Sequence, residues 1–370
     1  MQLTGGYPFS LINNGLLFSY PKLSKNIQTE VVIIGGGISG ALTAHYLINA
    51  GIECILVDGR TIGLGSTCAS TSLLQYELDE PLHLLKKKVG EKNAKRAYQL
   101  CGQSIDDIIQ IMNDINFKDY KKTGSLFFST HRSEKKFMQS EFAARKKAGF
   151  DVELLSANEV EKSFGLQAEY AIFSSIGCTA DAYSLTHALL QYSVKKGLQV
   201  FDRTCISHVQ YKKNTSLQTT DGFIIKAKNI VNATGYEVVN FISKNIVDTY
   251  CTYAIISEHE ESDNPLWKDN VMMWNTDIPY LYMRLTKDNR IIVGGRDERF
   301  SNAFTRQVLV EKKSRQLQKD FHKILPEISF KKEFAWSGTF GKTKDSLPYI
   351  GAYKKTPNTY YALGFGGNGI

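Results

Sequence analysis

Three closely spaced glycines and one acid are the residues whose chemistry is easiest to infer. Gly35, Gly37 and Gly40 form a G-x-G-x-x-G pattern directly after an apolar run, and Asp58 ends the next apolar run. Such glycines permit a tight turn, let the backbone approach a pyrophosphate, and let a helix pack closely on a strand. A carboxylate at the position of Asp58 can accept hydrogen bonds from an adenosine ribose. The pattern predicts dinucleotide binding and leaves NAD and FAD both open.

A strand-helix-strand unit has to position these residues. Residues 31–34 are a continuous β-branched run, which is typical of a strand buried on both faces. Apolar residues then recur at helical spacing as far as Gly51, and residues 52–57 return to a strand pattern. The first residues of the helix, Ile38 and Ser39, are expected where the positive end of the helix dipole faces the phosphates.

Glycine-rich segments far along the chain favour the longer dinucleotide. Residues 60–71 combine two glycines with small hydroxyl and thiol side chains, residues 230–235 form a short strand pattern that ends in Ala-Thr-Gly, and residues 364–370 read GFGGNGI. A pure NAD domain would instead continue with alternating strands and helices. A long flavin dinucleotide needs several distant backbone loops along its length, and glycine allows the close approach.

Length and composition exclude several classes of protein. The chain has 370 residues, enough for two domains, and a net charge of +8. Its lysine pairs are dispersed rather than clustered with aromatics, so a nucleic-acid partner is not expected. No membrane-spanning apolar run and no signal peptide are seen. Six cysteines without a C-x-x-C pair indicate a reducing, cytoplasmic location, and the seven histidines show no metal-ligand spacing.

A series of segments in one order resembles a known family. The segments are GGGISG, GLGSTCASTSLLQYELDEP, NATGYE, IIVGGRDE, WSGTFGKTKDSLPYIG and GFGGNGI, and they cover the chain from about residue 29 to its last residue. In this order they resemble the D-amino-acid oxidase/glycine oxidase (DAO) family of FAD-dependent oxidoreductases. Within that family the sequence looks nearest to uncharacterised bacterial members and, more distantly, to gamma-glutamylputrescine oxidase.

The resemblance implies an α/β fold, α+β overall, with two domains. A discontinuous Rossmann-like FAD domain would comprise residues 1–80, 155–245 and 335–370. A substrate domain with a large, mostly antiparallel sheet would comprise residues 81–154 and 246–334.

FAD is the implied cofactor, and its contacts can be carried over by motif. Residues 60–71 would run along the pyrophosphate and the flavin, residues 73–76 would lie beside the isoalloxazine ring, and the C-terminal glycine loop would meet the ribityl chain and the pyrimidine edge. Cys68 could form a covalent flavin link, although a buried free cysteine is the commoner state. The expected cofactor-binding residues are Gly35, Gly37, Ile38, Ser39, Gly40, Asp58, Gly59, Arg60, Gly65, Ser66, Thr67, Ala69, Ser70, Thr71, Ile206, Ala233, Thr234, Gly235, Gly341, Gly364, Phe365, Gly366, Gly367, Asn368, Gly369 and Ile370.

The activity of the family implies the partners of this chain. Family members oxidise a C–N bond, so a small amine or amino acid is the expected substrate, with dioxygen or another electron acceptor as the second partner. Hydride would pass to flavin N5, and the imine would hydrolyse in water. Because the cofactor carries the redox chemistry, no dedicated catalytic side chain is expected.

One position departs from the family pattern and bears on the substrate. Phe340 stands where amino-acid oxidases of the family usually have an arginine that clamps the substrate carboxylate. This departure puts a simple D-amino-acid or glycine substrate in doubt. It favours an amine, or a substrate whose carboxylate lies elsewhere.

Other side chains are candidates for the substrate pocket. Tyr282 and Arg284 share one face of a strand pattern, and that face either lines a pocket or meets solvent. Tyr253 is either a pocket residue or an ordinary core tyrosine. Tyr76 ends the segment expected beside the flavin ring. Arg296, Asp297 and Glu298 follow two glycines at a strand end, where a surface ion pair is expected rather than a pocket.

Two other functions stay open at this point. An enzyme of the same fold could modify a side chain attached to tRNA, which the basic net charge permits. The chain could also be a weakened FAD-binding relative without activity. In the family the C-terminal glycine loop leads into a helix whose N-terminus points at the cofactor. Here the sequence stops at Ile370, so we expect a truncated chain whose FAD site is weakened or empty.

Overall fold

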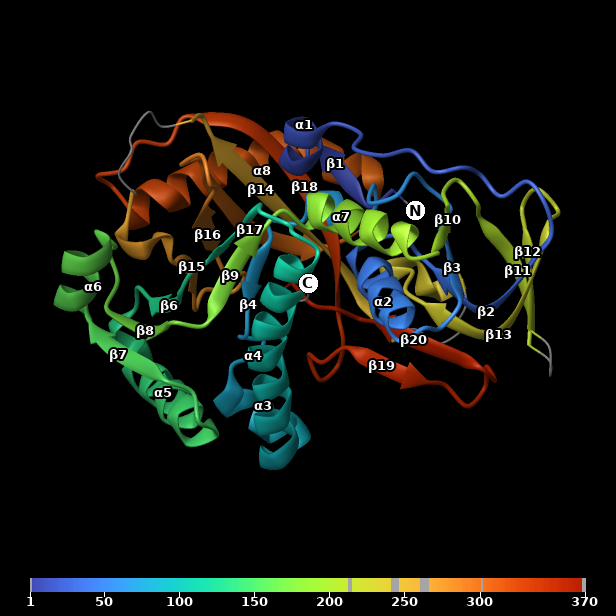
Figure 1. Ribbon diagram of the computed structural model, residues 1–370. Helices are drawn as coiled ribbons and strands as arrows, with labels where there is room; N and C mark the ends of the chain where they lie inside the picture. The colour runs from blue at the N-terminus through green and yellow to red at the C-terminus, as the bar shows by residue number, and fades with distance from the viewer. Residues whose placement is uncertain (1, 212–214, 241–245, 260–265, 301, 368–370) are drawn as a thin grey trace.

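The computed structural model describes residues 2–211, 215–240, 246–259, 266–300 and 302–367. Two large sheets and one small sheet contain its strands, and helices pack against the large sheets (Figure 1). Within the described ranges, no helix combines the length and the apolar content needed to cross a membrane. The helices are α1 (Phe9–Asn14), α2 (Ile38–Asn49), α3 (Leu82–Val89), α4 (Glu91–Asp114), α5 (Lys135–Ala148), α6 (Ala157–Phe164), α7 (Ala182–Lys195) and α8 (Ala303–Ile324), with short 3-10 turns at Thr67–Ala69, Arg132–Glu134, Gly235–Asn240 and Lys268–Asn270.

The first large sheet contains the strand-helix-strand unit predicted from the glycine pattern. Strands β2 (Ile27–Ile34) and β3 (Cys54–Val57) pair in parallel, and helix α2 connects them. Gly51, where the helix was expected to end, has a positive φ of 73° just beyond it. Parallel pairing continues from β3 to β10 (Gln199–Phe201), from β2 to β13 (Ile224–Asn232) and from β13 to β20 (Thr359–Leu363). The antiparallel strands β12 (Thr215–Thr219), β11 (Ile206–Gln210) and β19 (Tyr349–Ala352) complete this Rossmann-like sheet.

Helices α2 and α7 lie side by side against this sheet (Figure 1). The close packing of α2 depends on Gly40, because a Cβ there would lie 1.8 Å from the carbonyl oxygen of Gly35. Apolar side chains of α2, α4 and α7 join those of β2 and β3 in one buried cluster. The turn after β2 is therefore held rigidly between a strand and a helix.

The second large sheet is mostly antiparallel. Its strands, in order across the sheet, are β1 (Thr4–Gly6), β18 (Lys332–Lys342), β14 (Asp248–Ser257), β17 (Ile291–Arg299), β16 (Tyr282–Leu285), β15 (Met272–Asn275), β6 (Ser125–Ser129), β8 (Tyr170–Ser174) and β7 (Val152–Ser156). The described pairs are antiparallel except β15 with β6. Helix α8 packs on β14, β17 and β18, and its Leu317 and Phe321 enter the core of this half. The predicted fold class is confirmed.

A small third sheet holds the segment that was expected beside the flavin ring. Strand β4 (Leu73–Gln75) pairs with β9 (Gly177–Ala180), which also pairs with β5 (Tyr120–Lys122). The backbone of residues 73–75 therefore makes its hydrogen bonds within a sheet. Residues 73–76 do not line the cavity of the candidate site, and their expected position beside the flavin ring stays a prediction.

The domain boundaries remain a prediction. Strands β1 and β8 belong to the nine-stranded sheet, although the sequence places residues 1–80 and 155–245 in the FAD domain. Strand β18 begins at Lys332, just before the expected boundary at residue 335.

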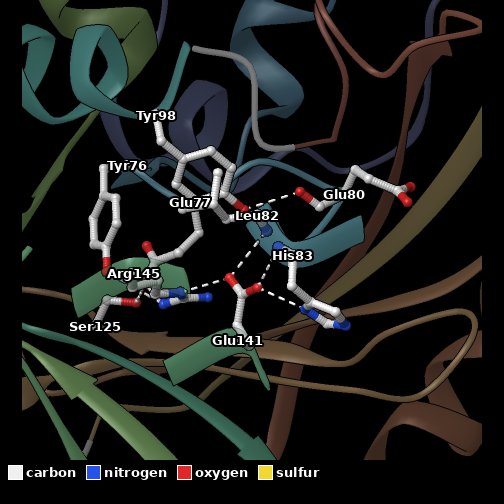
Figure 2. Close-up of polar contacts among 9 residues, drawn as sticks. All are labelled: Tyr76, Glu77, Glu80, Leu82, His83, Tyr98, Ser125, Glu141 and Arg145. Carbon is white, nitrogen blue, oxygen red and sulfur yellow. Dashed lines mark hydrogen bonds and ion pairs between the residues drawn. The ribbon is translucent and has the colours of Figure 1, made fainter. Parts of the chain in front are cut away.

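A fully buried ion cluster joins helix α5 to the chain between β4 and α3 (Figure 2). Nε of Arg145 donates to Glu141 at 2.7 Å, and its Nη1 donates to Glu77 at 3.0 Å. These three side chains are 0% exposed. Ser125 of β6 donates to the same Glu77 oxygen at 3.0 Å, so the cluster also contacts the nine-stranded sheet.

The carboxylate of Glu141 also caps helix α3. It accepts the backbone N–H groups of Leu82 at 3.1 Å and of His83 at 2.9 Å, which the first helical turn leaves without intrahelical partners. Burial disfavours the charged carboxylate, but Arg145 and the hydrogen bonds from His83 outweigh it and lower the pKa of Glu141 to about 2. At Glu77 burial prevails over the attraction of Arg145 and raises the pKa.

Tyr76 belongs to this cluster, and the structure corrects the expectation that it lines a substrate pocket. Its hydroxyl accepts a hydrogen bond from Nη1 of Arg145 at 3.2 Å. Its ring stacks on Phe150 with 4.5 Å between the centroids, and the side chain is 0% exposed. A buried, fully packed tyrosine of this kind has no surface left for a substrate.

The cluster predicts a large effect of one substitution on stability. We expect Arg145→Met to lower the free energy of unfolding by about 3–5 kcal/mol, because two buried carboxylates lose their compensating charge. Urea denaturation followed by circular dichroism measures this change. Arg132→Met is the matched control, since that side chain is 86% exposed and pairs only at the surface with Glu169. It should leave the free energy of unfolding nearly unchanged, and equal effects of the two substitutions would contradict the role of the cluster.

Candidate cofactor and substrate site

One cavity of about 500 Å³ is lined by residues from both large sheets. Most of the residues predicted to bind the cofactor lie on its wall, although they come from segments far apart in the chain. Asn368, Gly369 and Ile370 lie outside the described residues. The predicted cofactor residues that line the cavity are Gly35, Gly37, Ile38, Ser39, Asp58, Gly59, Arg60, Gly65, Ser66, Thr67, Ala69, Ser70, Thr71, Ile206, Ala233, Thr234, Gly235, Phe365, Gly366 and Gly367.

The glycine pattern forms a turn that a larger residue could not adopt. Gly35 has a φ of 111°, and a Cβ there would lie 2.4 Å from the carbonyl oxygen of Ala233. A Cβ on Gly37 would meet Oγ1 of Thr67 at 2.8 Å and no other heavy atom within 4 Å outside its chain neighbours, so this position is open toward the cavity. Gly40 does not line the cavity and serves the packing of α2 instead. The N-terminus of α2 is thereby presented to the cavity as a site for an anion.

Asp58 ends strand β3 on the wall of the cavity. Its two oxygens accept the backbone N–H groups of Gly36 at 2.6 Å and of Arg60 at 2.7 Å. Burial raises the pKa of Asp58, and the two hydrogen bonds only partly oppose the rise. Each carboxylate oxygen has a second lone pair, so the side chain can also accept hydrogen bonds from ribose hydroxyls.

An ion pair that the sequence analysis did not foresee lies beside Asp58. Nη1 and Nη2 of Arg60 each lie 2.6 Å from a carboxylate oxygen of Glu237, and both residues line the cavity. Glu237 belongs to the quoted segment NATGYE, so an acid two residues after the Ala-Thr-Gly turn was the signal that could have found it.

The C-terminal glycine loop is held by an acid that sequence reasoning also missed. Asp79 accepts the backbone N–H of Gly367 at 2.8 Å and the hydroxyl of Tyr280 at 3.1 Å. The hydroxyl of Tyr236 donates to the carbonyl oxygen of Phe365 at 3.1 Å. Asp79 follows closely after Glu77 in the chain, so the buried ion cluster anchors the segment that holds this loop.

Three other residues near the expected cofactor do not line the cavity. A Cβ on Gly341 would lie 2.3 Å from the side chain of Val247, and one on Gly364 would lie 2.8 Å from that of Thr343, so both glycines serve packing. The thiol of Cys68 is buried and donates to Gly65 at 3.3 Å, and burial raises its pKa to about 12. In the described parts of the chain, no group of three or more His, Cys, Asp and Glu side chains could hold a metal ion.

Two of the five predicted substrate residues line the cavity, whereas Tyr76, Tyr253 and Arg284 do not. Tyr282 and Phe340 lie on its wall. Arg284 is buried, donates from Nε to the carbonyl oxygen of Thr71 and from Nη1 to that of Leu285 at 3.1 Å, and does not reach the cavity. Tyr253 is a core tyrosine, as one of the two interpretations held, and it donates to Glu298 at 2.6 Å. The substrate roles of Tyr253 and Arg284 are corrected accordingly.

The sequence predicts a surface ion pair for Asp297, but this residue lines the cavity instead. The neighbouring Arg296 does form such a pair, donating from Nε to Asp320 of α8 at 2.6 Å. Asp297 is instead directed inward, and burial raises the pKa of its carboxyl to about 6.

A β-bulge explains this difference. The register between β14 and β17 shifts between Cys251 and Tyr253, so that two residues of β17, Arg296 and Asp297, lie opposite a single residue of β14. Arg296 has a φ of 58°, and the local turn reverses which face the following side chain occupies. An alternating pattern in the sequence carries no sign of this shift, because the bulge depends on pairing with a distant strand.

The arrangement fits a flavin dinucleotide. The turn at Gly35 and Gly37 leaves room for a phosphate against the helix N-terminus, and Asp58 presents a carboxylate beside it. Residues 65–67, 69–71 and 365–367 continue the wall toward the nine-stranded sheet, so a long ligand can contact several separate loops.

Comparison with known proteins also indicates a flavin dinucleotide as the ligand of this cavity. The family model described as "FAD dependent oxidoreductase" (DAO) matches residues 30–370. Gamma-glutamylputrescine oxidoreductase of Escherichia coli is 20% identical over 95% of this chain and 82% of its own length. Glycine oxidase of Bacillus subtilis is 23% identical over 92% of this chain and 89% of its own length.

Solved structures share the fold. The crystal structure of L-proline dehydrogenase from P. horikoshii superposes with a TM-score of 0.76 at 23% identity, covering 94% of this chain and 90% of that one. Glycine oxidase from Geobacillus kaustophilus superposes with a TM-score of 0.78 at 18% identity, covering 92% and 90%. Together with the family match over residues 30–370, these likenesses show that the chain belongs to the DAO family of FAD-dependent oxidoreductases and that FAD is its cofactor.

Proposed function

We propose that the protein oxidises a C–N bond of a small amine or amino acid and passes the electrons to dioxygen or another acceptor. The observation that carries the proposal is one cavity in which a dinucleotide-binding turn faces aromatic and polar side chains of the nine-stranded sheet. Similar proteins named for glycine, L-proline and gamma-glutamylputrescine support this class of substrate.

The residues of this chain bind and orient the reactants. When bound, FAD supplies the redox chemistry, which is acceptance of a hydride at flavin N5 from the carbon beside the substrate nitrogen, and water then hydrolyses the imine. In this proposal the turn at Gly35 and Gly37 holds the pyrophosphate and Asp58 accepts ribose hydroxyls. We assign no side chain the role of general acid or base.

An aromatic wall forms the substrate side of the cavity. The rings of Tyr280 and Tyr282 lie 5.8 Å apart, and Phe340 lies on the same wall. Burial raises the pKa of both tyrosines, so their hydroxyls stay protonated. The hydroxyl of Tyr280 donates to Asp79, and that of Tyr282 shares a hydrogen bond with Thr252 at 3.1 Å. Among the described residues that line the cavity, Arg60 is the only cation, and it is bound to Glu237. A substrate carboxylate therefore has no arginine clamp on this wall, which supports an amine.

Two further expectations stay predictions from the sequence. They are a cytoplasmic location and the lack of a nucleic-acid partner, which rest on cysteine usage and on dispersed lysines.

The proposed function makes a prediction about the flavin and its reduction. Protein supplied with FAD should show a flavin absorption spectrum, and anaerobic addition of primary or secondary amines should bleach it more readily than amino acids do, because Phe340 replaces the carboxylate clamp. A spectrophotometer under nitrogen measures both steps. Protein that stays colourless with FAD, or a bound flavin that no amine or amino acid reduces, would overturn the proposed function.

Salt-sensitive retention of tRNA in a filter-binding assay would instead favour a tRNA-modifying enzyme.

The second prediction concerns the ribose contact. Asp58→Ala should weaken FAD binding about 10- to 100-fold, since hydrogen bonds to a charged acceptor contribute about 1.5–3 kcal/mol. Fluorescence titration of the apoprotein with FAD gives the dissociation constant. Asp151→Asn is the control, because that side chain is 94% exposed and remote from the cavity wall. An unchanged dissociation constant for Asp58→Ala would show that the carboxylate does not contact FAD.

A further inference from the structure

The cavity wall formed by the nine-stranded sheet is anionic. Asp297 of β17 lines this wall, and Asp79 adjoins it through its hydrogen bond with Tyr280. Arg60, the one cation among the described residues lining the cavity, binds Glu237 beside the turn of the other sheet. The wall at Asp297 therefore repels a carboxylate and attracts a positively charged group.

One oxygen of Asp297 is an unsatisfied acceptor. Its Oδ1 is buried and has no hydrogen-bond partner among the described residues. Burial raises the pKa of the carboxyl to about 6, against the opposing effects of Thr252 and Lys342. At neutral pH the group is thus a carboxylate with an unused acceptor, and a buried acceptor of this kind is normally paired.

Neither lysine near Asp297 lines the cavity. The ammonium of Lys342 lies over the ring of Phe340, 5.7 Å from its centroid, and that of Lys313 binds Glu298 at 2.8 Å. Neither ammonium forms an ion pair with Asp297 in the described part of the chain, so this carboxylate can pair with a cation that enters the cavity. The titratable groups around Asp297 are Lys342, Lys313, Asp79, Tyr280 and Tyr282.

The chemistry of amine oxidation decides which nitrogen Asp297 can bind. The nitrogen next to the oxidised carbon has to be neutral, because its lone pair assists the departure of hydride. A carboxylate beside that nitrogen would stabilise the ammonium form and slow the reaction. A second, protonated nitrogen elsewhere in the substrate can keep its ion pair throughout the reaction.

We propose that Asp297 binds a protonated nitrogen of the substrate other than the nitrogen at the oxidised carbon, which makes diamines the substrate class. This inference rests on the proposed oxidation of a C–N bond. It assigns Asp297 a role in specificity, and it explains why the wall that carries Phe340 in place of an arginine also carries an inward-facing acid.

Binding without turnover tests the cation site. tert-Butylamine has no hydrogen on the carbon beside its nitrogen, so it cannot be oxidised, and its binding can be followed by the shift of the flavin spectrum. Asp297→Asn should weaken its binding about tenfold or more, since the interaction involves two charges. Glu298→Gln removes a neighbouring carboxylate that does not line the cavity and should leave the affinity unchanged. Equal affinity in wild type and Asp297→Asn would overturn the proposal.

The pH dependence of the same binding gives a second measurement. Asp297 is charged above a pKa of about 6, so the wild type should bind tert-butylamine about tenfold more weakly at about pH 5 than at about pH 7.5. In Asp297→Asn this dependence should disappear. A pH dependence that persists in the variant would contradict the assignment to Asp297.

Turnover separates this inference from the proposed function. Diaminobutane, butylamine and aminobutanoate have chains of equal length that end in an ammonium, a methyl group and a carboxylate. The wild type should reduce its flavin fastest with diaminobutane and slowest with aminobutanoate. Asp297→Asn should lower the ratio of these two flavin-reduction rates about tenfold or more.

If amines reduce the flavin in an order that Asp297→Asn does not change, this inference fails while the proposed function stands. If no amine or amino acid reduces the flavin, the proposed function fails, and tert-butylamine binding still decides whether Asp297 is a cation site.

Discussion

The contact of Arg145 with Glu77 and Glu141 is the interaction on which the geometry of the site depends. It fixes helix α5, the start of helix α3 and the chain that precedes α3 at one buried point. From that chain Asp79 extends to the C-terminal glycine loop and to Tyr280, both on the cavity wall. Burying these three charged groups is costly unless they are paired. The contact therefore favours the one arrangement in which helix α5 and the chain before α3 meet at this point.

The two walls of the cavity differ in how they hold a ligand. The wall from the Rossmann-like sheet offers backbone groups, a helix N-terminus and the carboxylate of Asp58, which suit a cofactor that is the same in all members of the family. The wall from the nine-stranded sheet offers side chains such as Tyr282, Phe340 and Asp297. Side chains can change without disturbing a strand's backbone, and for this reason the proposed substrate contacts are assigned to the second wall.

Local sequence patterns predicted the parts of the structure that depend on local interactions. The β2–α2–β3 unit is contiguous, and its glycines are required by backbone geometry, so spacing alone indicated it. Tyr76 and Arg284 were misplaced because their partners, Arg145 and the carbonyl oxygen of Thr71, come from distant segments. Asp297 was expected in a surface ion pair, but its inward direction results from a bulge that depends on pairing with a distant strand. Elements were therefore easier to predict than the direction of individual side chains.

Strand β1 has a consequence for the order in which the protein can assemble during synthesis. It pairs with β18, and the cavity is lined both by Leu3, next to β1, and by Phe340 of β18. During synthesis β1 is made long before β18, so this edge of the sheet cannot close until β18 has also been made. Until then the edge strand and its apolar neighbours are exposed, which is the condition in which chains aggregate or recruit chaperones. FAD can meet its complete binding wall only after β18 and residues 365–367 have been made, so cofactor binding is coupled to the joining of these distant segments rather than to the folding of the β2–α2–β3 unit alone.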